Sequence, residues 1–99
     1  MFAISGMMRF DPSEHDEVVE VLAKLTSTSR NDPGCVAYWF AEDVVDAGTF
    51  RFFESWEDDT TFDGHCATPH YLDFSQRFLP RLKAVEATRY DVSGTTKLA

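Results

Sequence analysis

The order of its apolar segments constrains the fold of this chain most strongly, because four strand-like segments are interleaved with two helical regions within 99 residues. Alternating side chains predict strands over Phe2–Phe10, Cys35–Glu42, Thr49–Trp56 and Val85–Val92. Helical spacing predicts one helix after Asp11, with Ser13 as its N-cap, and a pair of short helices between Asp58 and Pro80. This order predicts an α+β, ferredoxin-like split βαβ fold, with a four-stranded antiparallel sheet and helices on one face. We expect one domain over residues 1–92 and a polar tail over 93–99.

The predicted strands are apolar on both sides, which indicates that both faces of the sheet are covered. The helices can cover only one face. A chain this short buries only about 60–65% of its unfolded surface, so a second copy is a natural source of further burial. We therefore expect a homodimer in which two sheets pack together as a dimeric α+β barrel.

The charge balance excludes some classes of partner. Nine Lys and Arg stand against 17 Asp and Glu, a formal net charge of −8, whereas a nucleic-acid-binding surface needs clustered cations. No apolar run approaches a membrane span, and a cytoplasmic protein is expected. Most of the acids between Glu42 and Asp63 fit solvated turns and a helix start. Cys35 and Cys66 fit neither a disulfide framework nor a metal motif.

One acid in that segment stands apart. Glu54 lies on the same strand face as Phe50, Phe52 and Trp56, in an aromatic row. A buried carboxylate without a partner is costly. Two interpretations stay open: a structural carboxylate paired with a nearby arginine (Arg51 or Arg89) or with backbone donors, or a general base whose pKa is raised by burial.

Several short motifs together resemble the antibiotic biosynthesis monooxygenase family of dimeric α+β barrels. They are Arg30-x-x-Pro33-Gly34-Cys35-x-x-Tyr38, Glu54-Ser55-Trp56-x-Asp58, Phe62-x-x-His65 and Pro69-His70. Their order and spacing are more specific for the fold than for an activity. The resemblance implies a small oxygenase that needs no metal, flavin or haem and acts on a phenolic, anthrone-like or quinol-like aromatic substrate with O₂.

Such chemistry needs a base, donors for a developing anion, and a flat apolar slot. The resemblance places a histidine at this position and implies His65 as the base, since imidazole titrates near neutrality. Glu54 is a candidate for orienting His65, or for acting as a base itself if burial raises its pKa. His70, just inside a predicted helix start, is a candidate neutral donor. The candidate slot residues are Trp56, Tyr38, Phe52 and Phe62. Core packing for the aromatics, and a surface position for either histidine, remain the alternatives.

Metal and haem are not expected. His65 and His70 with Asp63 or Asp73 would be a ligand set, but Pro69 breaks the helical spacing of a zinc site. Haem-degrading relatives use a strand Asn, a helix Trp and a helix His, where this chain has Ser5, His65 and Ser75. Two other functions stay open, since fold does not determine function: a non-catalytic small-molecule-binding or stress-related barrel, and a cofactor-free isomerase or lyase.

Overall fold

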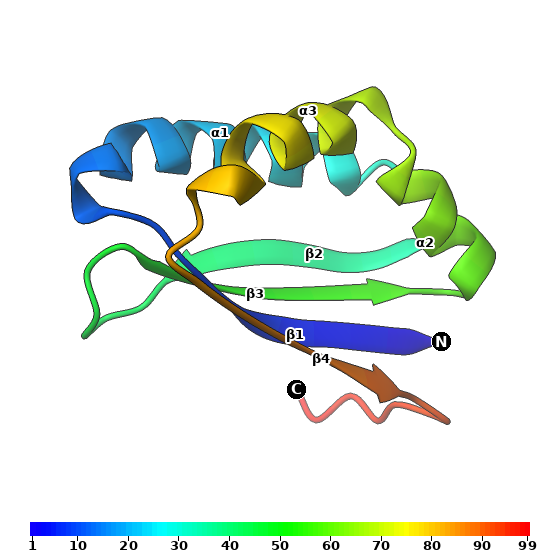
Figure 1. Cartoon of the computed structure of the whole chain (residues 1–99). Coiled ribbons are helices and arrows are strands. Elements are labelled where there is room, and N and C mark those ends of the chain that lie inside the picture. The colour runs from blue at the N-terminus through cyan, green and yellow to red at the C-terminus, as the bar shows by residue number, and fades with distance from the viewer.

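The computed structural model describes residues 1–99 and confirms the predicted fold (Figure 1). Its elements are β1 (Phe2–Arg9), a 3₁₀ turn (Pro12–Glu14), α1 (His15–Ser29), β2 (Cys35–Glu42), β3 (Thr49–Trp56), α2 (Asp59–Cys66), α3 (Pro69–Phe78), a second 3₁₀ turn (Leu79–Arg81) and β4 (Ala84–Asp91). All strand pairs are antiparallel, in the order β2-β3-β1-β4. The two central strands, β1 and β3, are therefore neighbours although they are about 40 residues apart in the chain.

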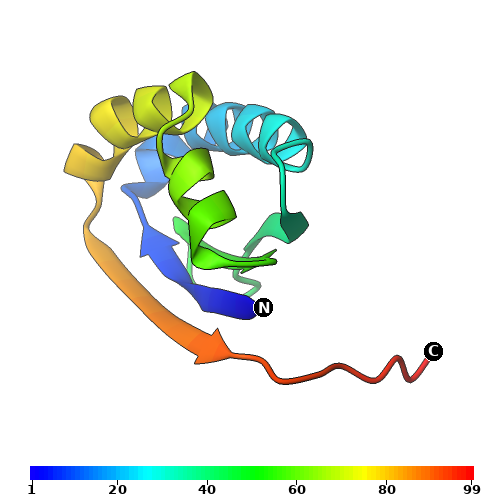
Figure 2. The same ribbon diagram turned by 90° about the vertical axis from the view of Figure 1, so that its right-hand side faces the viewer.

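Two layers build the molecule. α1 and α3 lie together over one face of the sheet, and α2 lies at the end where β3 finishes (Figures 1 and 2). The core between the layers is mainly aromatic and aliphatic. Its buried members are Phe2, Phe10, Val18, Leu22, Leu25, Tyr38, Phe50, Trp56, Phe74 and Phe78. β1, β2 and β3 supply inward-facing side chains to this core, as the period of two residues predicts, whereas β4 is almost wholly exposed and supplies none.

The start of the first helix differs from the prediction. Ser13 is not the N-cap of α1, because it lies inside the 3₁₀ turn that precedes this helix. Asp11 caps that turn instead, and its Oδ1 accepts hydrogen bonds from the Ser13 N–H at 2.9 Å and the Ser13 hydroxyl at 2.7 Å. The following Pro12 occupies a first-turn position, where a missing N–H costs nothing.

The buried face of α3 also differs in detail. Helical spacing predicts Leu72 on one apolar stripe with Leu79 and Leu82. In the structure Phe74 and Phe78 are fully buried, whereas Leu72 is 43% exposed. Phe74 and Phe78 occupy the positions against the sheet, because their large rings bury more apolar area there than a leucine side chain does. Pro80 ends α3 as expected, and the chain turns through the short 3₁₀ segment into β4.

The outer face of the sheet carries exposed aromatic side chains. Trp39 is 42% exposed and stacks on Phe53 at 5.8 Å between ring centroids, and Tyr90 is 54% exposed. The chain after β4 runs away from the domain (Figure 2). None of the helices has the length and apolar character needed to cross a membrane.

Candidate active site

Three elements bring one carboxylate and two imidazoles together. Asp32 lies in the turn between α1 and β2, His65 near the end of α2, and His70 in the first turn of α3. One oxygen of Asp32, Oδ2, lies 2.7 Å from His65 Nδ1 and 2.8 Å from His70 Nε2. Both distances are those of hydrogen bonds in which a charged group takes part. This Asp32–His65–His70 cluster is the centre of the candidate site.

The turn that holds Asp32 is packed directly on α2. Gly34 adopts a φ of 78°, and a Cβ there would lie 2.4 Å from the Thr61 side chain. Only glycine has both the backbone freedom and the small size for this approach. The Glu57 N–H also donates to the Gly34 carbonyl at 2.9 Å, which ties the turn to the end of β3. Asp32 is thereby held beside α2.

The two histidines are fixed by helix capping. Asp58 and Thr61 form a capping box that starts α2. At the other end of α2, the Thr68 hydroxyl donates to the His65 carbonyl at 2.6 Å and accepts from the Tyr71 N–H at 3.3 Å, as the N-cap of α3. One threonine therefore joins the end of one helix to the start of the next, and sets His65 and His70 side by side.

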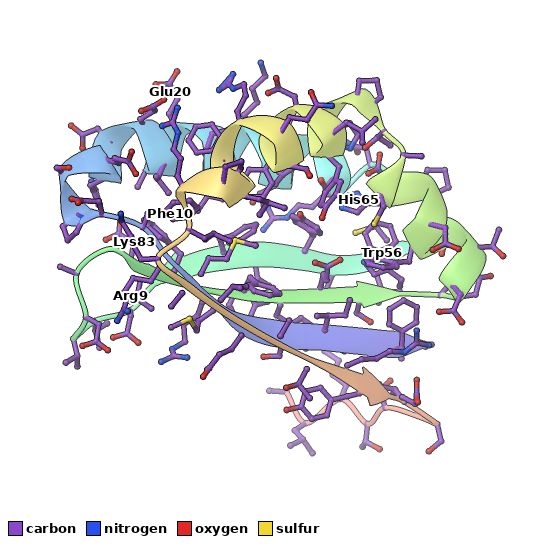
Figure 3. All side chains as sticks on the ribbon, in the orientation of Figure 1. Arg9, Phe10, Glu20, Trp56, His65 and Lys83 are labelled. Carbon is purple, nitrogen blue, oxygen red and sulfur yellow. The ribbon has the colours of Figure 1, made fainter.

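His65 lies inside the domain. It is 1% exposed, and its ring centroid is 4.7 Å from that of Trp56, 5.1 Å from Tyr71 and 5.4 Å from Tyr38. Figure 3 shows His65 and Trp56 at the end of the sheet that α2 covers. The second ring nitrogen, Nε2, is buried and has no hydrogen-bond partner. Such an orphaned polar atom is rare in a folded interior.

The contacts of His65 assign its protons. An ionised carboxylate can only accept, so Nδ1 carries the proton that is donated to Asp32 and Nε2 holds a free lone pair in the neutral ring. Burial lowers the pKa of His65 below its usual value, although Asp32 works in the opposite direction. The neutral form therefore dominates at neutral pH, and its lone pair points into a protein interior.

Glu54 is close to this site but has a different partner from those expected. Its Oε1 accepts a hydrogen bond from Trp56 Nε1 at 2.8 Å. The arginines considered as partners bind elsewhere, Arg51 to Asp43 and Arg89 to Asp59 and Asp91. Glu54 does not orient His65 as considered from the sequence, because His65 Nδ1 is bound to Asp32 and His65 Nε2 has no hydrogen-bond partner. Burial raises the pKa of Glu54, and the Trp56 hydrogen bond opposes that rise.

Trp56 links the two groups, since one face of its ring is against His65 while its N–H binds Glu54. Of the other predicted slot residues, Tyr38 and Phe62 lie against Trp56, whereas the ring contact of Phe52 is with Phe40. Tyr38 and Phe52 are buried, and Phe62 is half-buried with its ring centroid 6.0 Å from that of Trp56. Burial strongly raises the pKa of Tyr38, so its phenol stays protonated and can serve as a donor.

The larger hollows of the surface lie apart from His65. One, of about 370 Å³, runs between α1 and β2; a second of the same volume lies between α1 and α3 and includes His70; a third, of about 220 Å³, is mostly polar. His65, Glu54 and Trp56 line none of the three. The expected residues thus converge, but they do so in a packed interior rather than around a large open cavity.

The Asp32–His65–His70 cluster is also the one group of His, Cys, Asp and Glu side chains in this chain that could together ligate a metal ion. One ligand atom each from Asp32, His65 and His70 lies within 4.8 Å of the others. Neither Asp63 nor Asp73, the acids considered from the sequence, belongs to the group. Hydrogen bonds already satisfy the three ligand atoms, so the cluster needs no metal to account for its geometry.

Sequence reasoning missed two residues of the site. The segment Asn31-Asp32-Pro33-Gly34 is typical of a turn that ends a helix, and this pattern predicts no further role for Asp32. Its available signal was an acidic side chain beside a Pro-Gly turn that must pack closely on another element. Helical spacing predicts Tyr71 only as a packing residue of the second helix of the pair, whereas its ring centroid lies 5.1 Å from that of His65. The Asp32 contact joins residues 33 positions apart in the chain, and the Tyr71 contact depends on the angle between α2 and α3.

Comparisons with known proteins agree with this architecture. Residues 1–77 match the sequence profile of the family described as antibiotic biosynthesis monooxygenase. An uncharacterized protein of Synechocystis, sll1783, is 29% identical over 96 residues, which are 96% of this chain and 65% of that protein. The chain thus spans about two-thirds of the length of this relative.

Solved structures show the same fold. A crystal structure of an antibiotic biosynthesis monooxygenase superposes with a TM-score of 0.86 at 26% identity, over 95% of this chain and 100% of the other. PA3566 from Pseudomonas aeruginosa gives 0.82 at 26% identity, over 90% of each chain. A protein from Deinococcus radiodurans gives 0.87 at 18% identity, over 100% of this chain and 99% of the other, a likeness in fold. Because the family profile covers more than three-quarters of the residues, the chain belongs to the antibiotic biosynthesis monooxygenase family.

Proposed function

We propose that this protein is a cofactor-independent monooxygenase that oxidises a phenolic, anthrone-like or quinol-like small molecule with O₂. The observation that carries the proposal is the buried, unpartnered Nε2 of His65, whose opposite nitrogen donates to Asp32. A neutral imidazole fixed in this way is a general base that awaits a proton donor. Membership of the family supports the reaction class.

In the proposed reaction, His65 Nε2 removes a proton from the substrate and leaves a delocalised anion. Asp32 stabilises the imidazolium that forms, and the Tyr38 hydroxyl is a candidate donor to the anion. The anion passes one electron to O₂, and the two radicals combine to a hydroperoxide. The His65 imidazolium gives its proton to the peroxide oxygen, and the neutral ring then removes the remaining hydrogen of the carbon that bears the hydroperoxide. The O–O bond breaks, hydroxide leaves with that proton as water, and a methylene or a ring CH para to a phenol becomes a carbonyl. For an anthrone, substrate plus O₂ gives quinone plus water.

Substrate access is part of the proposal. None of the three larger hollows reaches His65, so side chains over the imidazole must move to admit a flat ring. Tyr71 is the ring that α3 places against His65, and it is half-buried rather than locked in the core. We assign Trp56, Phe52 and Phe62 to the walls of the opened slot.

His70 acts differently from the direct donor expected from the sequence. Its Nε2 is bound to Asp32, so in this proposal it positions the carboxylate and does not touch the substrate. Glu54 remains a second candidate for holding a proton, because burial raises its pKa and Trp56 connects it to His65. The proposed reaction requires no cofactor.

Oxygen uptake tests the proposal. The assay uses dithranol, 1,4-dihydroxynaphthalene and 1-naphthol as substrates, with wild type, His65→Gln and Glu54→Gln. The matched control is His15→Gln, because His15 is half-buried at the start of α1 and binds Asp16 and Glu42 rather than the cluster. We expect His65→Gln to lose about 10²-fold or more in rate, with His15→Gln unchanged. Uptake no faster than the uncatalysed reaction on every substrate, or a His65→Gln rate equal to wild type, would refute it.

A second candidate function is non-catalytic binding of a small molecule. The separation between His65 and the larger hollows favours it, because a pure binding protein needs a hollow but no base. A monooxygenase takes up oxygen and converts its ligand. A binding protein takes up no oxygen, and its ligand is recovered unchanged.

We also propose that the protein works as a homodimer formed through the outer face of the sheet. The stacked and partly exposed Trp39 and Phe53 lie on this face, and exposed aromatic rings in one patch are typical of protein interfaces. Pairing would cover the face that the helices leave open (Figure 2). Sedimentation equilibrium across a concentration range tests the association.

A further inference from the structure

The groove between α1 and β2 has the chemistry of a ligand site that is separate from His65. Its volume is about 370 Å³, within the range of small-molecule pockets. Apolar side chains from both layers form most of it, among them Leu22 from α1, Phe40 from β2 and Phe50 from β3. A groove of this size accepts a ligand of two or three fused rings.

Arg30 is the cation that lines this groove. Its Nε donates to the Tyr38 carbonyl at 2.9 Å, which fixes the plane of the guanidinium at the end of α1. No carboxylate lies within 4.0 Å of the Arg30 guanidinium, although the chain carries 17 Asp and Glu. Four other arginines each have a carboxylate partner: Arg51, Arg77, Arg81 and Arg89. The terminal nitrogens of Arg30 are therefore free to bind an anion in the paired geometry that guanidinium favours.

The one acid in the groove is at its opposite end. Glu42 accepts from His15 Nε2 at 2.8 Å, at the start of α1. Along β2, Glu42 is four residues from Tyr38, to which Arg30 is tied, a span of about 13 Å for an extended strand. The groove therefore has an apolar middle, a free cation at one end and an already paired carboxylate at the other.

We propose that this groove binds a flat aromatic carboxylate, with its rings against Phe40 and Phe50 and its carboxylate on Arg30. The charge complementarity at Arg30 selects an anionic head over a neutral one. The site stands whether or not the protein is an oxygenase, because no group in it takes part in the chemistry proposed for His65. A substrate of the His65 site would not need the carboxylate.

The test compares 2-naphthoate with 2-naphthamide, its uncharged counterpart, by titration calorimetry and by amide NMR shifts of the full chain. We expect 2-naphthoate to bind more tightly, with shifts along α1 and β2. Arg30→Gln should weaken 2-naphthoate about fivefold, the upper range for an exposed ion pair, and leave 2-naphthamide unchanged, while Arg30→Lys retains part of the preference. Arg9→Gln is the matched control, since Arg9 also lacks a carboxylate partner and lies outside the groove.

A second variant tests the apolar part. Ala23 is an exposed residue of α1 that lines the groove, and Ala23→Phe places a ring in it without disturbing the core. We expect this variant to lose most of its binding of both compounds. The proposal is overturned if 2-naphthoate binds no better than 2-naphthamide, if Arg30→Gln and Arg9→Gln behave alike, or if the shifts appear around His65 and Trp56. Shifts in the groove that depend on protein concentration alone would assign it to a second copy and also overturn the proposal.

Discussion

Replacing Asp32 with asparagine removes the charge that organises the site. In the wild type, one carboxylate oxygen accepts from both His65 and His70, at 2.7 and 2.8 Å. An asparagine is nearly the same size, but it has one carbonyl oxygen and an NH₂ group that can only donate. If the NH₂ group faces His65, Nδ1 becomes the acceptor and the ring proton moves to Nε2. The lone pair proposed as the base is then lost.

The cost in stability follows from the two hydrogen bonds. A hydrogen bond to a charged group contributes about 1.5–3 kcal/mol, against about 1 kcal/mol for a neutral one. The side chains of Asp32 and His70 are 11% and 22% exposed, so solvent reduces the difference on that side. We expect Asp32→Asn to lower the free energy of unfolding by about 2 kcal/mol. For a domain of this size, that corresponds to a decrease of roughly 10 °C in Tm.

The pH dependence has a definite sign. Burial lowers the pKa of His65 in the folded state, so the unfolded chain binds more protons below about pH 6.5. The stability that neutral His65 contributes is therefore fully present above that pH, and it is lost as the pH falls toward and through the pKa of His65 in the folded state. Asp32 opposes the lowering, and its removal makes the loss larger. The free energy of unfolding of Asp32→Asn should thus fall further below that of wild type at pH 5.5 than at pH 7.5.

Three measurements check this reasoning without any substrate. Denaturant unfolding at both pH values gives the free energies, and long-range ¹H–¹⁵N spectra of the histidine rings show which His65 nitrogen carries the proton. Asp63→Asn is the control, because Asp63 is an exposed acid on the same helix as His65. The assignment is refuted if wild-type His65 carries its proton on Nε2, or if Asp32→Asn and Asp63→Asn change stability equally.

Three further predictions concern other parts of the chain. Glu54→Gln should raise the free energy of unfolding by about 1 kcal/mol at pH 7 and less at pH 4, since burial raises the pKa of this carboxyl and a Gln oxygen can still accept from Trp56; equal unfolding curves at pH 7 would contradict this, with denaturant titration as the measurement. Gly6→Ala should cost about 3 kcal/mol or more, because its Cβ would lie 1.9 Å from the Glu86 carbonyl oxygen; a thermal melt like that of wild type would show that β1 and β4 can separate freely. Trp39→Ser should weaken dimerisation at least tenfold by sedimentation equilibrium while leaving the monomer fold intact by circular dichroism, and an unchanged dimer would exclude this face as the interface.

Local pattern was enough to predict the elements and their order. Alternation of side chains with a period of two is a property of a single strand, so β3 and its aromatic row from Phe50 to Trp56 were readable directly. The same holds for Pro80, whose ring cannot continue a helix wherever it occurs. The place of Glu54 among aromatic rings was also evident from this pattern, and in the structure burial raises the pKa of its carboxyl group.

The partners of the site residues could not be read in this way. Glu54 had several donors within reach by sequence, and only packing decided that Trp56 satisfies it. His65 was identified as a candidate by its motif, but the carboxylate that fixes its proton comes from 33 residues earlier in the chain. That contact depends on how the Gly34 turn packs on α2, and no local rule contains such a distance.

What the amino-acid sequence by itself determined is the ferredoxin-like topology, the aromatic core and the identity of His65 as the residue to examine. The topology and the core follow from interactions within one strand, helix or turn, whose period and capping chemistry lie in consecutive residues. His65 follows from the motifs that resemble the family. Tertiary structure alone decided that Asp32 and not Glu54 holds His65, that Nε2 is left buried without a partner, and that Arg30 is free at the end of a separate groove. These are outcomes of the layers closing on each other, because only then are side chains distant in sequence deprived of water and forced to find partners.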